Sequence, residues 1–270
     1  MYVYFLPKTG KYKLTQMKIV TYNVNGIRSA IGKGFAEWLK AANPDILCLQ
    51  EIKANAEQIP VEIFEEQGYY HYWYPAQKKG YSGVAILSKI EPRQVVYGCG
   101  IEKYDVEGRV IRADFDFASV MSVYMPSGTT GDERQAFKMQ WLDDFRKYLS
   151  ELRKTHPCLV ISGDFNICHK PIDIHNPISN KNSSGFLPEE RAWVDLFLSD
   201  GFIDTFRAFN HQPHQYTWWS FRANARVKNL GWRIDYHMTS EVLREQLKSS
   251  HILPEAKHSD HCPVLLELND

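Results

Sequence analysis

Six short apolar runs, each ending in polar side chains, constrain the fold of this chain more than any other feature. Their lengths suit buried β-strands. Because a strand end holds its side chain rigidly over the rim of a sheet, six polar tips predict one shared site. The tips are rich in asparagine, aspartate, glutamate, tyrosine and histidine. The runs with their tips cover residues 19–23, 46–51, 120–124, 159–166, 232–236 and 258–266.

The order of these runs predicts how the chain is layered. Strands interleave with few helices, and many strands look buried on one face only, which favours two sheets packed face to face with helices outside. A Rossmann fold is disfavoured because no GxGxxG follows the first strand, and no P-loop lysine motif occurs. The sequence therefore predicts a layered α/β architecture.

The length of the chain permits one large domain or two ordinary ones. Its 270 residues are 44% apolar and 13% aromatic, which is ample for a sizeable core. No linker, low-complexity tract or repeat divides it, so we expect a single domain over residues 17–270. Residues 1–16 precede the first convincing strand and are interpreted as an appendage without an assigned role.

Apolar periodicity and end signals predict three helices. The first covers residues 35–42, and Asp132 can cap a long second helix that reaches residue 152. Pro188 is well placed as the first residue of the third. The long polar loop before it, about residues 165–187, predicts a functional segment, since loops of that length inside compact domains usually carry function.

Charge and cysteine content limit the chemistry of the site. The net charge of zero neither supports nor excludes a polyanion partner, because DNA binding needs only a positive face. The five cysteines form no CxxC, which disfavours a thiolate zinc site and favours buried free thiols in a reducing interior. No stretch is long enough to span a bilayer and the first residues make a poor signal peptide, so we expect a cytoplasmic protein without a membrane partner.

Two of the polar tips suggest metal binding and activation of water. Glu51 follows an apolar run and is either an exposed strand-end residue or a ligand for a hard divalent cation such as magnesium. In the tip at residues 163–166, Asp164 and Asn166 are expected to project on the same side of an extended segment, where they can orient and polarise a water. The alternative is an Asx-turn that merely ends the strand.

Three further side chains suggest phosphate chemistry. Asp235 and His261 are a candidate pair, in which a buried carboxylate fixes the imidazole tautomer and favours its charged form. A protonated histidine can then stabilise charge on a phosphoryl group. Tyr124 ends its strand and can donate its hydroxyl to a phosphate oxygen, although a tyrosine at the edge of the core is equally compatible with the sequence.

The stretch from Trp218 to Trp232 suggests a nucleic-acid partner. It combines interleaved aromatic rings with cations, and no acidic residue interrupts it before Asp235. Cations suit phosphates and flat rings suit bases or a deoxyribose. A solvated basic loop over an aromatic core is the alternative. The cations of this stretch and its flank are Arg222, Arg226, Lys228 and Arg233.

Assembled in order, these motifs resemble the exonuclease III family of abasic-site DNA endonucleases, within the endonuclease/exonuclease/phosphatase superfamily. Each motif is weak alone, but seven in register over about residues 17–268 make a chance match very improbable. The resemblance implies a DNase I-like fold, a four-layered α/β sandwich of two packed mixed β-sheets flanked by helices. The matching motifs are YNVNG (22–26), LQEIK (49–53), YSGV (81–84), YMP (124–126), GDFN (163–166), GWRIDY (231–236) and SDHCP (259–263).

The resemblance also implies roles for individual residues. It implies a magnesium ion, for which manganese can substitute, held mainly by Glu51 with Asn23 and Asp260 nearby. The implied catalytic residues include Asp164, which would activate the attacking water, and Asn166, which would orient that water. His261, held by Asp235, and Tyr124 would contact the scissile phosphate. The implied substrate-binding residues are Trp218, Trp232 and Ile234 around an apolar pocket for the flipped-out abasic sugar, and Arg28, Lys53 and Tyr81 along the DNA.

The activity implied is magnesium-dependent nicking of double-stranded DNA 5′ of abasic sites in base excision repair, by a monomer. A 3′-5′ exonuclease or 3′-phosphatase activity is compatible with it. Alternatives are cleavage of inositol phosphates or lipid headgroups on the same fold, and a non-catalytic DNA-binding module. Two departures matter: relatives usually carry an amide where Ser127 stands, and a capping hydroxyl where Leu187 stands.

Overall fold

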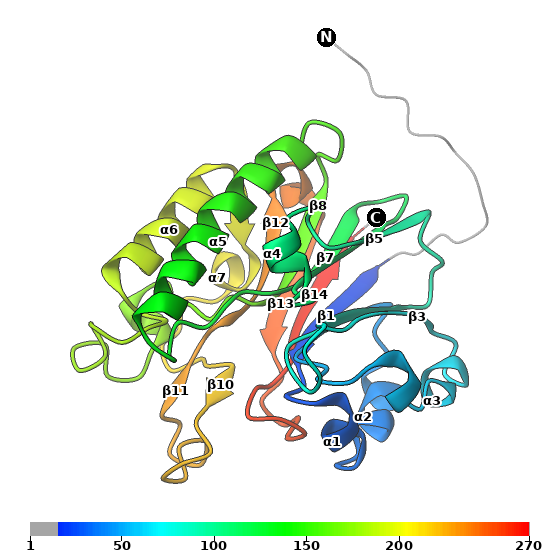
Figure 1. The fold of residues 1–270 in the computed structure, drawn as a ribbon, viewed down its shortest axis with the longest axis horizontal. Helices are drawn as coiled ribbons and strands as arrows, with labels where there is room; N and C mark the ends of the chain where they lie inside the picture. The colour runs from blue at the N-terminus through cyan, green and yellow to red at the C-terminus, as the bar shows by residue number, and fades with distance from the viewer. Residues whose placement is uncertain (1–15, 270) are drawn as a thin grey trace.

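The computed structural model describes residues 16–269, and it consists of two six-stranded sheets packed face to face between two layers of helices (Figure 1). Except for Gln16, the expected N-terminal appendage lies outside the described residues. The predicted four-layered α/β sandwich with two mixed sheets is therefore confirmed.

The first sheet contains both ends of the described chain. Its strand order is β13-β14-β1-β2-β4-β3, and only the β1–β2 pair is parallel. The strands are β1 (Met17–Asn23), β2 (Ile46–Gln50), β3 (Tyr70–Tyr74), β4 (Val84–Ser88), β13 (Leu247–Ile252) and β14 (Val264–Leu268).

The second sheet repeats this plan, with the order β5-β6-β7-β8-β12-β9 and a single parallel pair, β7–β8. A separate two-stranded hairpin lies between β9 and β12 in the chain. The strands are β5 (Gln94–Tyr97), β6 (Val110–Asp114), β7 (Ser119–Tyr124), β8 (Leu159–Asp164), β9 (Phe202–Asp204), β12 (Asp235–Ser240), and in the hairpin β10 (Trp218–Trp219) and β11 (Gly231–Trp232).

Helices cover the outer face of each sheet. In Figure 1 the long helices α5 and α6 lie on one side of the sheets, and α1, α2 and α3 lie on the other. The α-helices are α1 (Ile27–Ile31), α2 (Phe35–Ala42), α3 (Glu62–Glu65), α4 (Glu102–Asp105), α5 (Asp132–Leu152), α6 (Pro188–Ser199) and α7 (Thr205–Phe209). The 3₁₀ helices are η1 (Ala56–Gln58), η2 (Pro171–Asp173) and η3 (Glu241–Gln246).

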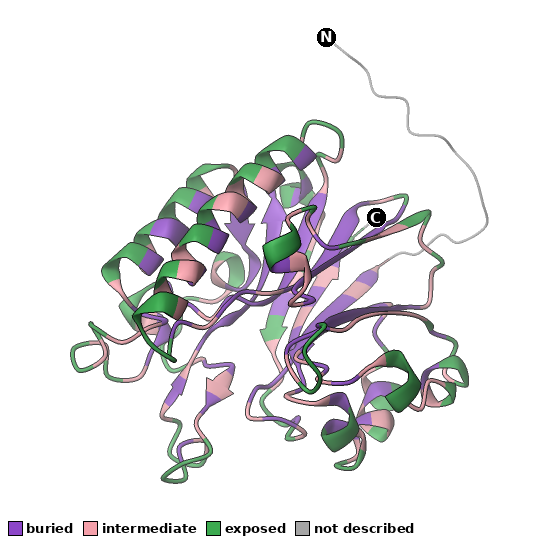
Figure 2. Cartoon of the chain, in the orientation of Figure 1, coloured by how far each residue is buried: buried purple, intermediate pink, exposed green. Residues whose placement is uncertain are grey.

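The expectation that many strands are buried on one face only is wrong. Strands β2, β4, β6, β8 and β12 are buried along their whole length. The physical reason is the layering, since each sheet has the other sheet on one face and helices on the other (Figure 2). Strands covered on both faces are buried at every position, polar residues included, instead of alternating between buried and exposed.

The helix predictions are confirmed with one correction. Helix α2 covers residues 35–42 and α6 begins at Pro188, as their end signals predict. Asp132 is not the cap of α5: Gly131 holds the N-cap position, and Asp132 is the first helical residue, with its negative charge at the positive end of the helix dipole. No helix within residues 16–269 is long and apolar enough to cross a membrane.

Two other details differ from the sequence predictions. The run at residues 232–236 is not one strand, because it breaks between β11 and β12, where Thr217 Oγ1 accepts the N–H groups of Ile234 and Asp235 at 3.0 and 3.1 Å. All five cysteines are free, as expected, but Cys99 and Cys158 are half-buried instead of buried.

Candidate active site at the rim of the two sheets

Strand register brings the predicted polar tips together at one rim. Tyr124 of β7 is paired with Asp164 of β8, and Asp164 is paired with Asp235 of β12. An isolated bridge between Trp218 and His261 brings the loop before β14 to the same place. Three adjacent strands of the second sheet therefore contribute one acidic or phenolic side chain each.

Three potential ligand groups converge from different elements. Ligand atoms of Glu51, Asp164 and His261 all lie within 4.8 Å of one another. Glu51 leaves the end of β2 with a left-handed backbone, at φ 51°. Asn23, at the end of β1, donates its amide nitrogen to Glu51 Oε1 at 2.9 Å and to Asp164 Oδ2 at 2.8 Å. The first sheet is thereby fastened to the second through this amide.

His261 and Asp235 form the pair that the sequence suggested. Nδ1 of His261 lies 2.9 Å from Asp235 Oδ2, and Nε2 lies 3.9 Å from Asp164 Oδ2. Burial alone lowers the pKa of His261, but the charge and hydrogen bond of Asp235, with the charge of Asp164, outweigh it and raise that pKa to about 10. The imidazole is therefore cationic at neutral pH.

Asp164 is a carboxylate whose pKa is strongly raised. Burial raises its pKa first and the charges of Asp235 and Glu51 raise it further, while His261 lowers it, and the resulting pKa is about 7. A carboxylate with that pKa can accept a proton and release it near neutral pH.

The expectation of an extended tip at residues 163–166 is wrong. The N–H of Asn166 donates to Asp164 Oδ1 at 2.8 Å, which closes an Asx-turn, and Asn166 adopts a left-handed φ of 52°. The turn does not remove the two side chains from the site, since both line the same cavity. The turn and the functional interpretation are therefore compatible.

Tyr124 presents a hydroxyl that stays protonated. Burial, followed by the charge of Glu51, raises its pKa, which Arg109 only partly offsets. The guanidinium of Arg109 lies 4.7 Å from the centre of the Tyr124 ring and donates to the Tyr124 carbonyl at 2.9 Å. Sequence reasoning missed Arg109. An arginine directly before the largely apolar run at residues 110–113 is a signal that its charge is buried against a partner.

An apolar slot lies beside these polar groups. The rings of Trp218 and Trp232 stand edge to face, 5.9 Å apart, and Ile234 packs with both. They line one cavity of about 820 Å³ together with Glu51, Tyr124, Asp164, Asn166, Asp260 and His261. The structure thus places the predicted slot and the predicted reacting groups in one space.

The sequence of this chain matches the Endonuclease/Exonuclease/phosphatase family over residues 20–261. The chain belongs to this family. It is 44% identical over 255 residues to the exodeoxyribonuclease of Bacillus subtilis, covering 94% of this chain and all of that protein. The resemblance predicted from the motifs is thereby confirmed, and so is the expectation of a nuclease-type hydrolase.

Two solved structures of the family have nearly the same fold. An AP endonuclease from Archaeoglobus fulgidus superposes with a TM-score of 0.85 at 34% identity, over 94% of this chain and 99% of that one. A 3′ phosphatase from Neisseria, bound to a product DNA hairpin, superposes with a TM-score of 0.87 at 30% identity, over 94% of this chain and 100% of that one.

Membership of this family implies a divalent metal ion, and the residues at the rim fit one. The Lys53 ammonium lies 2.7 Å from Glu51 Oε2, so this carboxylate already accommodates a positive charge. Oxygen-rich groups of this kind are what hard divalent ions prefer. Asn23 directs its nitrogen at the carboxylates while its oxygen accepts the Asn25 N–H at 3.0 Å, so its role as a ligand stays a prediction.

Asp260 lies at the edge of the group. Its oxygens accept hydrogen bonds from Asn25 Nδ2 at 2.9 Å and from Trp218 Nε1 at 3.0 Å. Burial raises its pKa, but the charge of His261 and these hydrogen bonds outweigh burial and lower it. Asp260 is therefore ionised and couples the slot to the metal-binding candidates. Asn25 had no role assigned from the sequence, although it belongs to the first motif.

The predicted DNA contacts lie around the cavity instead of inside it. Arg28 is exposed on α1, and Lys53 is held by Glu51 and by Asn25 Oδ1. The Tyr81 hydroxyl accepts hydrogen bonds from Arg109 at 2.9 Å and from Arg134 at 3.0 Å. Their contacts to DNA stay predictions.

The interpretation of the whole basic stretch as a phosphate-binding surface needs correction. Arg233 is fully buried and paired with Asp173 and Asp204. Arg226 donates to the carbonyls of Ser259, Pro254 and Ala256, which fixes the loop before the SDHCP motif. Only Arg222 and Lys228 remain exposed at the tip of the hairpin.

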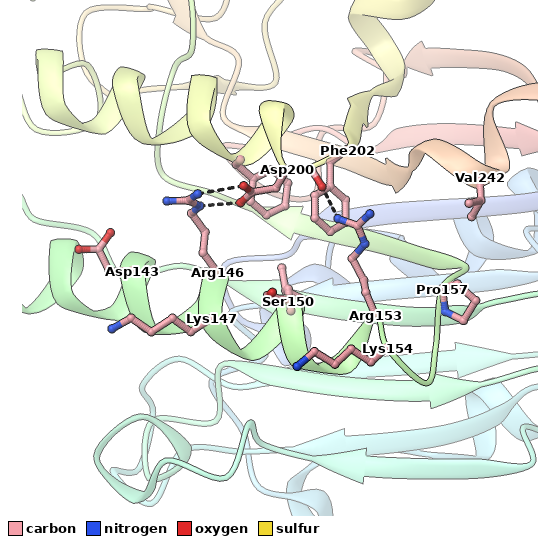
Figure 3. Close-up of a pocket in the computed structure, with 12 residues that line it drawn as sticks. Asp143, Arg146, Lys147, Ser150, Arg153, Lys154, Pro157, Asp200, Phe202 and Val242 are labelled. Atoms are coloured by element: carbon pink, nitrogen blue, oxygen red, sulfur yellow. Dashed lines mark hydrogen bonds and ion pairs between the residues drawn. The ribbon is translucent and has the colours of Figure 1, made fainter.

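A second hollow, of about 650 Å³, lies against the C-terminal half of α5, between that helix and α6 (Figure 3). Its arginines are occupied by the protein itself, since Arg146 donates to both oxygens of Asp200 at 2.8 and 3.0 Å. Arg153 donates to the Asp200 carbonyl and stacks over Phe202. This hollow lacks the acid–base groups that the rim cavity contains.

Proposed function

We propose that this protein is a magnesium-dependent DNA phosphodiesterase that nicks the backbone 5′ of abasic sites in base excision repair. The observation that carries the proposal is one shared cavity, in which the Asp164, His261 and Glu51 cluster adjoins an apolar slot walled by Trp218 and Trp232. A phosphodiester next to a sugar without its base needs both features at once.

Asp164 is proposed to take the proton of the attacking water. Its pKa of about 7 leaves much of it ionised at neutral pH, and general-base help of this kind is worth about 10²–10⁴-fold. Asn166 is proposed to orient that water. Its amide nitrogen is committed to the Met125 carbonyl at 3.0 Å, so its oxygen is the atom available to receive a water hydrogen bond.

His261 and Tyr124 are proposed to bind the oxygens of the scissile phosphate. His261 is cationic through Asp235 and has its Nε2 proton on the side of Asp164, while the Tyr124 hydroxyl remains a donor. Donors fixed before the reaction stabilise the charge that develops on the phosphoryl oxygens.

Glu51, with Asp260 and Asn23 close by, is the group proposed to hold Mg²⁺. When bound, such an ion neutralises charge on the phosphate and on the departing oxygen. The oxygen-rich composition of the group favours magnesium or manganese over zinc, which prefers nitrogen and sulfur ligands.

The slot is proposed to select the lesion by size. A sugar without its base can enter the slot that Trp218, Trp232 and Ile234 line, whereas an intact nucleotide is larger and costs a few kcal/mol more to unstack and unpair. Trp232→Ala should therefore lower the ratio of kcat/KM on abasic to undamaged duplex. An unchanged ratio would mean that Trp232 is only a core residue.

The decisive assay uses a labelled duplex with one abasic analogue, with magnesium, with EDTA, and with zinc alone. Nicking on the 5′ side of the analogue should require magnesium, be lost in EDTA and return when magnesium is restored. Full activity in EDTA, or restoration by zinc only, would contradict the proposal. An undamaged duplex and a phosphoinositide serve as competing substrates, and hydrolysis of the phosphoinositide alone would favour the lipid-headgroup alternative.

A 3′-phosphatase or 3′-5′ exonuclease activity is a second candidate for the same cavity, supported by the Neisseria 3′ phosphatase of the same fold. A parallel assay on a duplex with a 3′-phosphate at a nick measures the rate of this second activity relative to nicking at the abasic site. We also propose that the protein acts as a cytoplasmic monomer, which light scattering after size exclusion and cell fractionation would test.

A further inference from the structure

One buried ion pair behind the active-site cavity is not used by the chemistry proposed above. Lys138 of α5 and Glu190 of α6 are both fully buried, with Lys138 Nζ 2.5 Å from Glu190 Oε1. Burying two charges carries a large desolvation cost, and apolar residues of similar volume often fill such a place with equal or greater stability. Stability alone therefore does not explain the pair.

The hydrogen bonds of the pair lead to both ends of the long loop at residues 165–187. Lys138 Nζ donates to the carbonyl oxygen of Asn166 at 2.8 Å, at the start of the loop. Glu190 Oε2 accepts the N–H of Gly185 at 2.6 Å and of Leu187 at 2.9 Å, at the end of the loop. The two ends of the loop are thus fixed to one point.

The first end carries the water-orienting candidate. Asn166 has a left-handed backbone, with φ 52°, a conformation that is uncommon for non-glycine residues but that asparagine tolerates well. Its N–H is bound to Asp164 and its side-chain nitrogen to the Met125 carbonyl, so the bond from Lys138 to its carbonyl completes the set. Among the described residues, the Lys138 ammonium is the hydrogen-bond donor to the Asn166 carbonyl, and its removal would leave that carbonyl without this donor.

The second end supports the slot. Gly185 lies so close to the Trp232 ring that a methyl group there would come within 2.9 Å of it, and within 3.1 Å of the Asn166 carbonyl. Gly185 therefore fills the space between the slot wall and the start of the loop. Glu190, by holding the Gly185 N–H, determines how closely the loop backs the ring.

We propose that Lys138 and Glu190 are positioning residues that fix Asn166 and the Trp232 wall of the slot for the reaction. The inference rests on the proposed function, because it concerns the same site. Neither side chain hydrogen-bonds a group that is proposed to bind phosphate, so the hydrogen bonds of the pair reach the site through the loop backbone and through Gln135, whose Nε2 donates to Glu190 Oε1 at 3.0 Å.

The test compares wild type with Lys138→Met/Glu190→Gln. The double variant removes both charges together, and glutamine offers the Gly185 and Leu187 N–H groups a neutral oxygen, which binds them more weakly than the carboxylate does. We expect its kcat on the abasic duplex to fall about 10²-fold, since a misplacement of about 1 Å can cost that much. Binding of the abasic duplex in EDTA should stay near that of wild type, and the abasic-to-undamaged ratio should fall.

A double-mutant cycle with Asn166→Ala distinguishes a positioning role of the Lys138–Glu190 pair from a purely structural one. If the pair acts through Asn166, adding the double substitution to Asn166→Ala should cost little further kcat. Independent, multiplicative losses would overturn the proposal, as would a folded double variant with wild-type kcat. If the double variant does not fold, Glu190→Gln alone is used in the same cycle.

Phe145→Leu is the matched control, since it lies on the same helix in the apolar core and away from the loop. It should lose stability but retain kcat when both enzymes are assayed well below their melting temperatures. Failure of the proposed function is recognised separately, because wild type itself would then not nick the abasic duplex. The cycle can be repeated on whichever phosphoester wild type hydrolyses.

Discussion

Replacing Arg233 by methionine should destabilise the fold without weakening DNA binding. The guanidinium is fully buried between β12, α7 and the long loop, and it donates Nε to Asp173 Oδ1 at 2.7 Å. Its Nη1 and Nη2 donate to the two oxygens of Asp204 at 3.1 and 2.7 Å. Methionine fills much of the same volume but donates no hydrogen bond.

The size of the loss follows from what each carboxylate retains. Asp173 keeps the Arg207 guanidinium, at 2.9 and 2.6 Å, whereas Asp204 keeps only the Arg207 backbone N–H at 3.2 Å. Removing one partner of a buried pair costs about 3–5 kcal/mol, because the other charge is left uncompensated. In a domain of this size, such a loss of stability lowers the melting temperature by on the order of 10 °C.

The assay combines denaturant unfolding with DNA binding measured at several salt concentrations in EDTA. Arg222→Met is the matched control, because Arg222 is exposed on the adjoining hairpin. Arg222→Met should leave the free energy of unfolding unchanged. If Arg222 contacts a phosphate, the variant should also reduce the slope of log K for DNA binding against log salt concentration by about 0.9. Wild-type stability in Arg233→Met, or a reduced salt slope in it, would refute the reasoning.

The same network predicts how stability depends on acid. Burial raises the pKa of Asp173, but Arg233 and Arg207 outweigh it and lower that pKa from 3.8 to about 2. A carboxyl with a depressed folded-state pKa stabilises the fold above its ordinary pKa, and that contribution is lost as pH falls through about 2. The stability difference between wild type and Asp173→Asn should therefore shrink by about 2 kcal/mol from pH 5 to pH 2. A constant difference would contradict this assignment.

Three further outcomes are expected. Asp164→Asn should retain folding and DNA binding but lose about 10²–10⁴-fold in rate, and more than about a tenth of wild-type turnover would exclude Asp164 as the base. Asp235→Asn and His261→Ala should be strongly non-additive in kcat, because one orients and charges the other; multiplicative losses would show independence. Leu187→Thr should raise the free energy of unfolding by about 0.5–1 kcal/mol by adding a capping hydroxyl to α6, and an unchanged or lower melting temperature would contradict the cap.

Sequence periodicity and strand ends predicted the layers and the shared rim at which most of the candidate residues lie. The polar tips at Asp164 and Asp235 could be placed together because neighbouring strands of one sheet end at a common rim, and Asn23 reaches the same rim from the other sheet. The motif resemblance added roles that no local pattern contains. The family match over residues 20–261 confirms the resemblance, while the individual roles remain to be measured.

What could not be predicted depends on partners distant in sequence. Arg233 looks like a phosphate ligand until Asp173 and Asp204, 60 and 29 residues away, are seen to enclose it. Lys138 was equally hidden, although a lysine on the apolar face of α5, three residues before Trp141, signals a buried anion. The left-handed backbone at Glu51 was also hidden, because the contacts of this segment are distant in sequence: the Glu51 carbonyl accepts the Gly26 N–H at 2.7 Å.

The charges at the rim explain why a cation belongs there. Asp164, Asp235 and Glu51 crowd around one imidazole, and the pKa of Asp164 is raised by burial first and then by the negative charges of Asp235 and Glu51. The Lys53 ammonium balances Glu51 only from outside. A divalent ion supplies the missing positive charge and would favour the ionised form of Asp164, which is the form that can accept a proton. The crowding of carboxylates that adds to the effect of burial on the pKa of Asp164 therefore also favours a cation at this rim.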